Sequence, residues 1–102
     1  MLLAEISMWP MDKGASVGDD VARVLDVIDQ SGLPYKLGPL GTCVEGEVAE
    51  VFALVEKCHA VLEASSERVA CTIKMDWRRG KSGRLESKVR RVEAAVGRTL
   101  RT

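Results

Sequence analysis

The sequence predicts a single α+β domain over residues 1–102, with the element order β-α-β-β-α-β and one further helix at the end. Two observations predict this class. Stretches near both ends of the chain alternate apolar and polar residues with the period of a strand. Between them lie two segments with apolar residues at helical spacing. A chain of 102 residues can form one core, but it is close to the size at which partner subunits often help.

The first strand is expected over residues 2–9, where Pro10 ends it. Its two faces differ in character. One face holds Leu2, Ala4, Ile6 and Met8, and the other holds Leu3, Glu5, Ser7 and Trp9. Because the first set is entirely apolar, it is expected to meet the helices.

The first helix is expected to open at Ser16, with Asp19 as a shorter stand-in for the capping-box glutamate. Gly32 is expected to end it, and Pro34 prevents its return. The apolar stripe between these signals consists of Val17, Val21, Val24, Leu25 and Ile28.

Two short strands are expected next, over residues 35–40 and 42–45, joined tightly around Gly41. Gly38 and Pro39 weaken the earlier of the two, so it is expected at an edge of the sheet. The second helix is expected over residues 47–64, where Glu47 and Glu50 favour its N-terminus. Its apolar stripe is Val48, Val51, Phe52, Val55 and Leu62.

The last strand is expected over residues 69–77, with Val69, Cys71, Ile73, Met75 and Trp77 alternating against Ala70, Thr72, Lys74 and Asp76. A basic turn follows, and then a helix with a narrow apolar seam of Leu85, Val89, Val92 and Val96. Right-handed crossovers favour one topology for this order of elements, the ferredoxin-like sandwich. It has a four-stranded antiparallel sheet in the order 4-1-3-2, with two helices on one face.

In this topology the sheet keeps a helix-free face, which carries Glu5, Ser7, Trp9, Thr72, Lys74 and Asp76. Glu45 is expected to join them with either Thr42 or Cys43, depending on the register of the third strand. A mixed-charge face can simply be solvated. Because Leu3 and Trp9 interleave with the charges, the face also suits a subunit interface with a small ligand inside it.

The sequence gives little indication of an enzyme. It has no nucleophile elbow, no phosphate loop and no paired carboxylates. Cys43, Cys58 and Cys71 lack metal-ligand spacing and are expected to be small buried hydrophobic residues. The single histidine, His59, is expected at the margin of a helix stripe as a hydrogen-bonded residue. No cofactor is expected.

Charge is distributed unevenly although the net charge is zero. Residues 1–67 contain 12 acidic and 4 basic side chains, whereas residues 68–102 contain 3 acidic and 11 basic. The basic segment can lie on acidic helices of its own or a neighbouring subunit. It can instead bind phosphate or nucleic acid through Arg78, Arg79, Lys81, Arg84, Lys88, Arg90 and Arg91. Nucleic acid is less favoured because the chain has only four aromatic residues.

No apolar run approaches the ~20 residues that a membrane helix requires. The first residues carry no basic leader, and their apolar stretch is too short for a secretion signal. A cytoplasmic location without membrane attachment is therefore expected.

Several short fragments, in their order and spacing, resemble the family of small thiamine-binding proteins. They are Glu5-Ile6-Ser7 with Pro10, Ser16-Val17, Ser31-Gly32-Leu33, Gly41-Thr42, Glu45-Gly46, Lys57-Cys58-His59, Thr72-Ile73-Lys74 with Asp76, Arg78-Arg79, and Lys88-Val89. The resemblance covers nearly the whole chain. It implies a ferredoxin-like fold, assembly into dimers or tetramers, and binding of thiamine or its hydroxymethylpyrimidine moiety without catalysis.

The residues suit that ligand chemically. The exocyclic amine of an aminopyrimidine can donate to a carboxylate such as Glu45, and the ring nitrogens can accept from Ser7 or Thr42. A thiazolium cation favours a carboxylate or an aromatic face. Lys74 can balance Glu5 or Asp76, or meet a phosphate. The expected ligand-binding residues are Glu5, Ser7, Thr42, Glu45, Thr72, Lys74 and Asp76.

Overall fold

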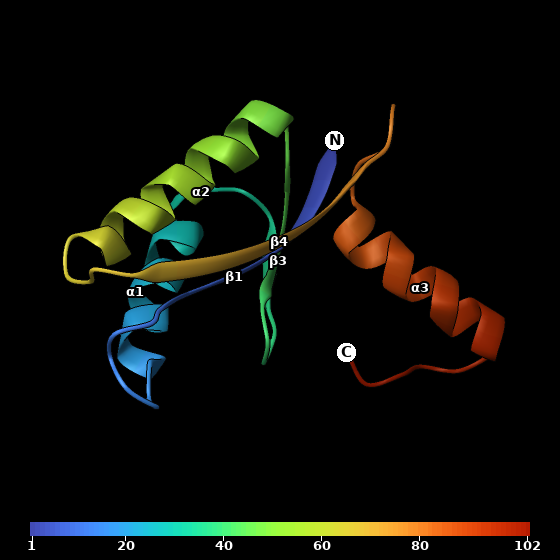
Figure 1. Cartoon of the computed structure of the whole chain (residues 1–102). Helices are drawn as coiled ribbons and strands as arrows, with labels where there is room; N and C mark the ends of the chain where they lie inside the picture. The colour runs from blue at the N-terminus through green and yellow to red at the C-terminus, as the bar shows by residue number, and fades with distance from the viewer.

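A computed structural model describes all residues, 1–102, and shows the expected α+β architecture (Figure 1). The elements in chain order are β1 (Leu2–Pro10), α1 (Gly18–Gln30), β2 (Tyr35–Leu37), β3 (Thr42–Gly46), α2 (Val48–Glu63), β4 (Val69–Trp77) and α3 (Arg84–Val96). The four strands form one antiparallel sheet in the order β2-β3-β1-β4. This confirms the ferredoxin-like topology and the predicted strand order. None of the three helices is long and apolar enough to cross a membrane.

The register of the central strands fixes which side chains share a face. Glu5 lies opposite Lys74 on β4 and opposite Cys43 on β3. Ile6 lies opposite Ile73 and Thr42. Because cross-strand partners point to the same side of a sheet, Cys43 shares the face of Glu5, whereas Thr42 shares the face of Ile6. The register thus decides the alternative that the sequence left open, in favour of Cys43.

The core lies between α1, α2 and one face of the sheet. Burial along β1 alternates as predicted, with the side chains of even-numbered residues buried against the helices. The buried apolar residues are Leu2, Ala4, Ile6, Met8, Val24, Ile28, Val44, Val51, Leu54, Cys58 and Leu62. The apolar face of β1 and the apolar stripe of α1 therefore pack together in a single apolar layer.

Both covering helices differ in detail from the prediction. Helix α1 begins at Gly18 after Val17, and no side chain caps it, so the predicted cap at Ser16 is wrong. Helix α2 buries Leu54 and Cys58, whereas Phe52 remains 49% exposed. The buried stripe of α2 is therefore rotated away from the predicted one, because α2 packs mainly against β1 and α1 and leaves the outer side of β4 uncovered.

The three cysteines do not share one environment. Cys58 is buried, and this burial raises the pKa of its thiol to about 11. Cys43 is half-buried, and Cys71 on the edge strand β4 is exposed. The prediction of a small buried hydrophobic residue is thus confirmed for Cys58 and wrong for Cys71.

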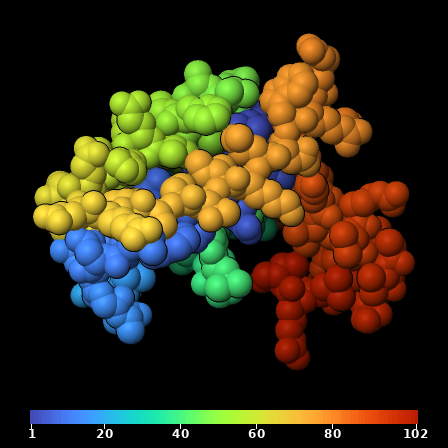
Figure 2. Space-filling model, in the orientation of Figure 1, coloured from blue at the N-terminus to red at the C-terminus, as the bar shows by residue number.

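Helix α3 stands apart from the other two helices, on the opposite side of the sheet (Figure 1). It contacts β3, so the predicted helix-free face is in fact occupied by a helix at one end. In Figure 2 this helix and the C-terminal residues form a separate lobe, which makes the molecule elongated, with extents of 46 × 29 × 20 Å. Within one chain the basic segment therefore does not lie on the acidic helices α1 and α2.

Candidate ligand-binding site

Four of the predicted site residues lie together on the sheet face opposite α1 and α2. Glu5 and Ser7 of β1 lie directly opposite Lys74 and Thr72 of β4. Side chains in such pairs have Cβ atoms about 5 Å apart, so the four polar groups form one patch. We call Glu5, Ser7, Thr72 and Lys74 the open-face cluster.

Cys43 adjoins the open-face cluster from β3. Its Sγ lies 3.9 Å from Oε2 of Glu5. Partial burial and the neighbouring Glu5 carboxylate together raise the pKa of the Cys43 thiol. The thiol therefore keeps its proton at neutral pH and can donate a weak hydrogen bond to Glu5.

Glu45 has a different partner from the predicted one. Its Oε1 accepts a hydrogen bond from the backbone N–H of Gly83 at 2.7 Å, and its Oε2 accepts one from the N–H of Arg84 at 3.0 Å. These are unpaired donors at the start of α3, which favour a carboxylate. Glu45 is only 4% exposed, so it fastens α3 to the sheet.

Asp76 is also engaged by α3. Its carboxylate accepts hydrogen bonds from the guanidinium of Arg84 and, at 3.0 Å, from Nζ of Lys88. The bonds from Lys88 and Arg84 lower the pKa of Asp76 below its ordinary value of 3.8. A third contact, an ion pair of 2.9 Å, joins Lys36 of β2 to Glu86 of α3. Three strands thus position the helix.

Thr42 lies on the other side of the sheet, away from the open-face cluster. It is 2% exposed, yet its hydroxyl forms no hydrogen bond within the chain and is not sealed from solvent. It lines a pocket of about 250 Å³, so the hydroxyl is reached from that pocket.

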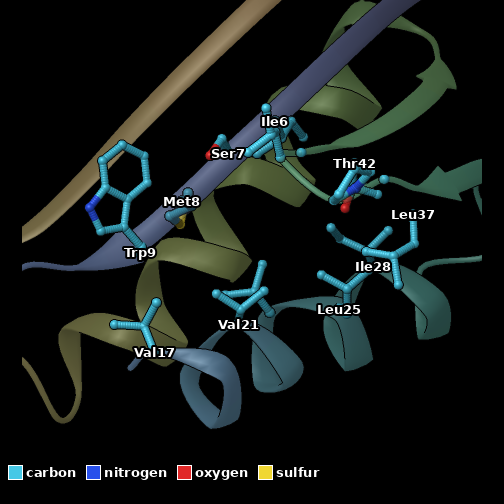
Figure 3. A pocket seen from close by; sticks show the side chains of 15 residues that line it. Ile6, Ser7, Met8, Trp9, Val17, Val21, Leu25, Ile28, Leu37 and Thr42 are labelled. Atoms are coloured by element: carbon cyan, nitrogen blue, oxygen red, sulfur yellow. The ribbon is translucent and has the colours of Figure 1, made fainter. Parts of the chain in front are cut away.

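The pocket is a mainly apolar slot between β1, α1 and the turn that joins β2 to β3. Figure 3 shows Val21 and Leu25 of α1 facing β1 across it, with Thr42 and Leu37 at one end and Trp9 and Val17 at the other. We call this pocket the β1 slot. Its lining comprises Ile6, Ser7, Met8, Trp9, Val17, Val21, Val24, Leu25, Ile28, Leu37, Gly38, Pro39, Leu40, Gly41 and Thr42.

The β1 slot lies beside a strand edge with no partner. Strand β1 pairs with β4 along its whole length but with β3 only from Leu2 to Ile6. From Ser7 to Pro10 the β3 side of β1 is therefore unpaired. Backbone N–H and C=O groups on such an edge are obligatory hydrogen-bonding groups that a planar ligand can pair with.

Gly41 joins the β1 slot to the open-face cluster. A side-chain carbon at this position would lie 3.1 Å from Cγ of Glu5 and 3.3 Å from the carbonyl oxygen of Ile6. Both contacts are tighter than carbon normally tolerates. The absence of a side chain at Gly41 therefore leaves room between the slot, which includes Ser7, and the carboxylate of Glu5.

The sequence interpretation did not identify the β1 slot, although one signal pointed to it. The first predicted strand was twice as long as the third, so part of its edge had to lack a neighbour. The helical spacing of Val21 and Leu25 on α1 predicts only a core position for them. They also line the slot, because no strand covers them at this end of the sheet.

Together, the slot and the cluster suit a small molecule with two different parts. An apolar, flat ring with hydrogen-bonding edges fits the β1 slot, where Thr42 and the free edge of β1 can pair with it. A cationic part fits beside Glu5.

Comparison with known proteins relates the chain to one family over most of its length. A family model described as thiamine-binding protein matches residues 4–93. The chain is 36% identical over 93 residues to a UPF0045 protein of Mycobacterium bovis, a match that covers 90% of this chain and 91% of the relative. It is 37% identical over 98 residues to the UPF0045 protein YqgV of Bacillus subtilis, covering 90% of this chain and 94% of the relative.

Solved structures show the same fold. A hypothetical protein from Methanocaldococcus jannaschii superposes with a TM-score of 0.83 at 28% identity, covering 89% of this chain and 94% of the other. A Thermotoga maritima protein, described as a candidate for thiamine biosynthesis or salvage, gives a TM-score of 0.79 at 25% identity. That match covers 89% of this chain and 97% of the other.

Proposed function

The chain belongs to the thiamine-binding protein family, and on this premise we propose that it binds thiamine or its hydroxymethylpyrimidine moiety without catalysing a reaction. Its role would be that of a carrier, buffer or sensor. The observation that carries the proposal is the β1 slot, in which an unpaired strand edge and a free hydroxyl adjoin an apolar cavity.

The pyrimidine ring occupies the β1 slot in this proposal. Its faces lie against the apolar side chains Val21 and Leu25 of α1. The hydroxyl of Thr42 donates to a ring nitrogen, and the free edge of β1 beyond Ile6 pairs with the exocyclic amine and the neighbouring nitrogen. Binding would thus satisfy polar groups that have no partner within the chain, which is where hydrogen bonds add most affinity.

The thiazolium ring lies over the open-face cluster. Its positive charge is attracted by the Glu5 carboxylate, which carries no ion pair to another side chain. Ser7 and Thr72 lie beside this position and offer hydroxyl groups. Lys74, directly opposite Glu5 on β4, can donate a hydrogen bond to an acceptor oxygen or nitrogen of the ligand. We assign Glu5, Ser7, Thr42, Thr72 and Lys74 to the ligand, and Glu45 and Asp76 to the attachment of α3.

Isothermal titration of the full chain with thiamine and with hydroxymethylpyrimidine tests the proposal. We expect saturable heat for both ligands, and we expect Glu5→Gln to weaken thiamine several-fold more than hydroxymethylpyrimidine, which lacks the cation. The matched control is Glu56→Gln, since Glu56 is exposed and lies on α2 away from the slot. Absence of heat for both ligands at millimolar concentration would contradict the function.

We also propose that the protein is a homo-oligomer, a dimer or tetramer, assembled through the open side of the sheet. The support is the apolar seam of α3, where Val92 remains 53% exposed and Val96 is also exposed. Exposed apolar side chains on a helix that lies on the open side of the sheet suit a contact with another subunit.

The mass of the assembly in sedimentation equilibrium tests this second proposal. Val92→Glu is expected to lower the mass, because it places a charge in the seam. Ala94→Glu is the matched control on the same helix, outside the seam, and is expected to leave the mass unchanged. A monomer in the unmodified protein would contradict the proposal.

A further inference from the structure

A second concave site lies between the end of β4 and α3, and it differs in chemistry from the β1 slot. We call it the α3 groove. It has a volume of about 710 Å³ and is lined by Asp76, Trp77, Arg78, Lys81, Ser82, Arg84, Ser87, Lys88, Arg91 and Val92. Five of these side chains are cationic, and Asp76 alone is anionic. In Figure 2 it belongs to the region where the end of β4 and the following loop meet the lobe of α3.

The positive charges of the α3 groove are only partly compensated. Arg84, whose side chain is 7% exposed, and Lys88 both contact the single carboxylate of Asp76. Arg78, Lys81 and Arg91 take part in none of the ion pairs of the chain. The groove therefore keeps a surplus of positive charge.

The spacing of the cations on α3 reinforces this surplus. Arg84, Lys88 and Arg91 follow one another at intervals of four and three residues, which places them on one face of the helix. Like charges at this spacing repel each other and destabilise a helix. A bound anion would reverse this repulsion.

We propose that the α3 groove binds the phosphate group of a phosphorylated small molecule, which, given the proposed function, is a phosphate ester of thiamine. Arg78, Lys81 and Arg91 supply charge-assisted hydrogen bonds, and Ser82 and Ser87 supply hydroxyl donors. The N-terminus of α3 takes no part, because Glu45 occupies it.

The order of the sites along β1 matches the order of groups in such an ester. The β1 slot lies at Ser7, the carboxylate for the cation is on Glu5, and Leu3 lies opposite Asp76 at the border of the α3 groove. Four residues of strand span ~13 Å. This is comparable to the reach of the ester from its pyrimidine through its thiazolium to the phosphate.

A small phosphate ester fits the groove better than a nucleic acid does. Single-stranded nucleic acid requires a continuous basic track with aromatic faces for stacking. Trp77 is the one aromatic residue of the groove, and Arg79 already covers it at 5.1 Å from the ring centre. The carboxylate of Asp76 also lies beside Arg84 and Lys88, where it would repel an extended phosphate backbone.

Titration of the full chain with thiamine, thiamine phosphate, pyrophosphate and a short RNA tests the inference. We expect thiamine phosphate to bind about tenfold more tightly than thiamine, as a few charge-assisted hydrogen bonds would give. In the double variant Lys81→Gln with Arg91→Gln this preference should disappear, while the affinity for thiamine stays the same. Arg90→Gln is the matched control, because Arg90 lies on α3 but does not line the groove.

The outcomes separate this inference from the proposed function. If thiamine binds and its phosphate ester binds no more tightly, the α3 groove is not a phosphate site, and the function stands. If pyrophosphate binds, its binding is lost in the double variant and thiamine does not bind, the α3 groove is supported as a phosphate site and the proposed thiamine-binding function fails. If only the RNA responds to the double variant, the inference is overturned. Thermal unfolding of each variant checks that it is folded.

Discussion

Thr42 and Glu45 lie on the same short strand but face opposite sides of the sheet, and each has a role that residue type alone does not reveal. A carboxylate at the end of a strand suggested a ligand contact. The position of Glu45 beside the start of α3 makes it a cap instead, because both of its oxygens accept backbone N–H groups there. The hydrogen bonds of Glu45 thus depend on the position of α3, which the sequence did not indicate.

Thr42→Val tests the assignment of the β1 slot. The substitution keeps the shape of the side chain and removes the hydroxyl, which forms no hydrogen bond within the chain. We therefore expect the free energy of unfolding to change by less than about 1 kcal/mol. Calorimetric affinity for hydroxymethylpyrimidine should fall about three- to tenfold, the value of one hydrogen bond. The same substitution at the exposed Thr99 should change neither quantity.

Glu45→Gln tests the capping role. One of the two acceptors becomes an amide that faces the N–H donors of α3, so we expect a loss of about 1–2 kcal/mol in stability from urea unfolding. Hydrogen exchange at the amides of Gly83 and Arg84 should accelerate, while thiamine affinity changes little. A large loss of affinity with unchanged exchange would show that Glu45 contacts the ligand.

The ionisation of Asp76 makes the attachment of α3 to the sheet depend on pH. Lys88 and Arg84 lower its pKa in the folded protein, so its stabilising contribution is present above the ordinary pKa of 3.8. This contribution is lost as the pH falls through the lower pKa of the folded state. Urea unfolding at pH 7 should therefore show a clear difference between the protein and Asp76→Asn, and this difference should shrink at pH 3. A difference that persists at low pH would mean that another group is responsible.

At the scale of elements, the strands and the sheet order followed from the sequence, and the helix faces followed less well. Strand faces were predictable because a period of two residues leaves only two choices, and β1 buries its even-numbered side chains as expected. Strand β4 does not show the expected alternation of burial. Cys71 and Met75, on its apolar face, stay exposed because β4 is an edge strand that α2 covers only in part. Helix α2 offered several apolar stripes that differ by a small rotation. Its actual orientation, with Leu54 and Cys58 inside and Phe52 outside, depends on how it packs against α1 and β1.

The prediction at the scale of elements concerns Gly41, in the turn between β2 and β3. Gly41→Ala would place a carbon 3.1 Å from Cγ of Glu5 and 3.3 Å from the carbonyl oxygen of Ile6. We expect it to displace Glu5 and narrow the passage between the β1 slot and the open-face cluster. Thiamine affinity should fall several-fold, while stability falls by about 1 kcal/mol, as modest overpacking costs.

Gly18→Ala is the control for this substitution. Gly18 is the first residue of α1, and an added carbon there meets no atom within 4 Å. Its thiamine affinity should match that of the unmodified protein, and its stability should be equal or higher by up to about 1 kcal/mol, because alanine favours a helix more than glycine does. Equal thiamine affinity in the Gly41 and Gly18 variants would contradict the passage between the two sites.

At the scale of the whole molecule, the division of charge along the sequence becomes a division in space. The acidic residues 1–67 build α1, α2 and three strands, whereas the basic residues follow into α3 on the far side of the sheet (Figure 1). The sequence predicted this asymmetry but not its location, because the helix is held by three specific contacts. The α3 groove arises only from that placement.

Amide chemical-shift mapping of the full chain with thiamine tests the central claim most directly, since it locates the ligand as well as detecting it. The account predicts that the largest shifts cluster at Ser7–Trp9, at Leu37–Thr42 and on the facing turns of α1 around Val21 and Leu25. Shifts confined to another hollow of the surface, such as the one lined by Phe52, His59 and Cys71, or no shifts at saturating thiamine, would contradict it.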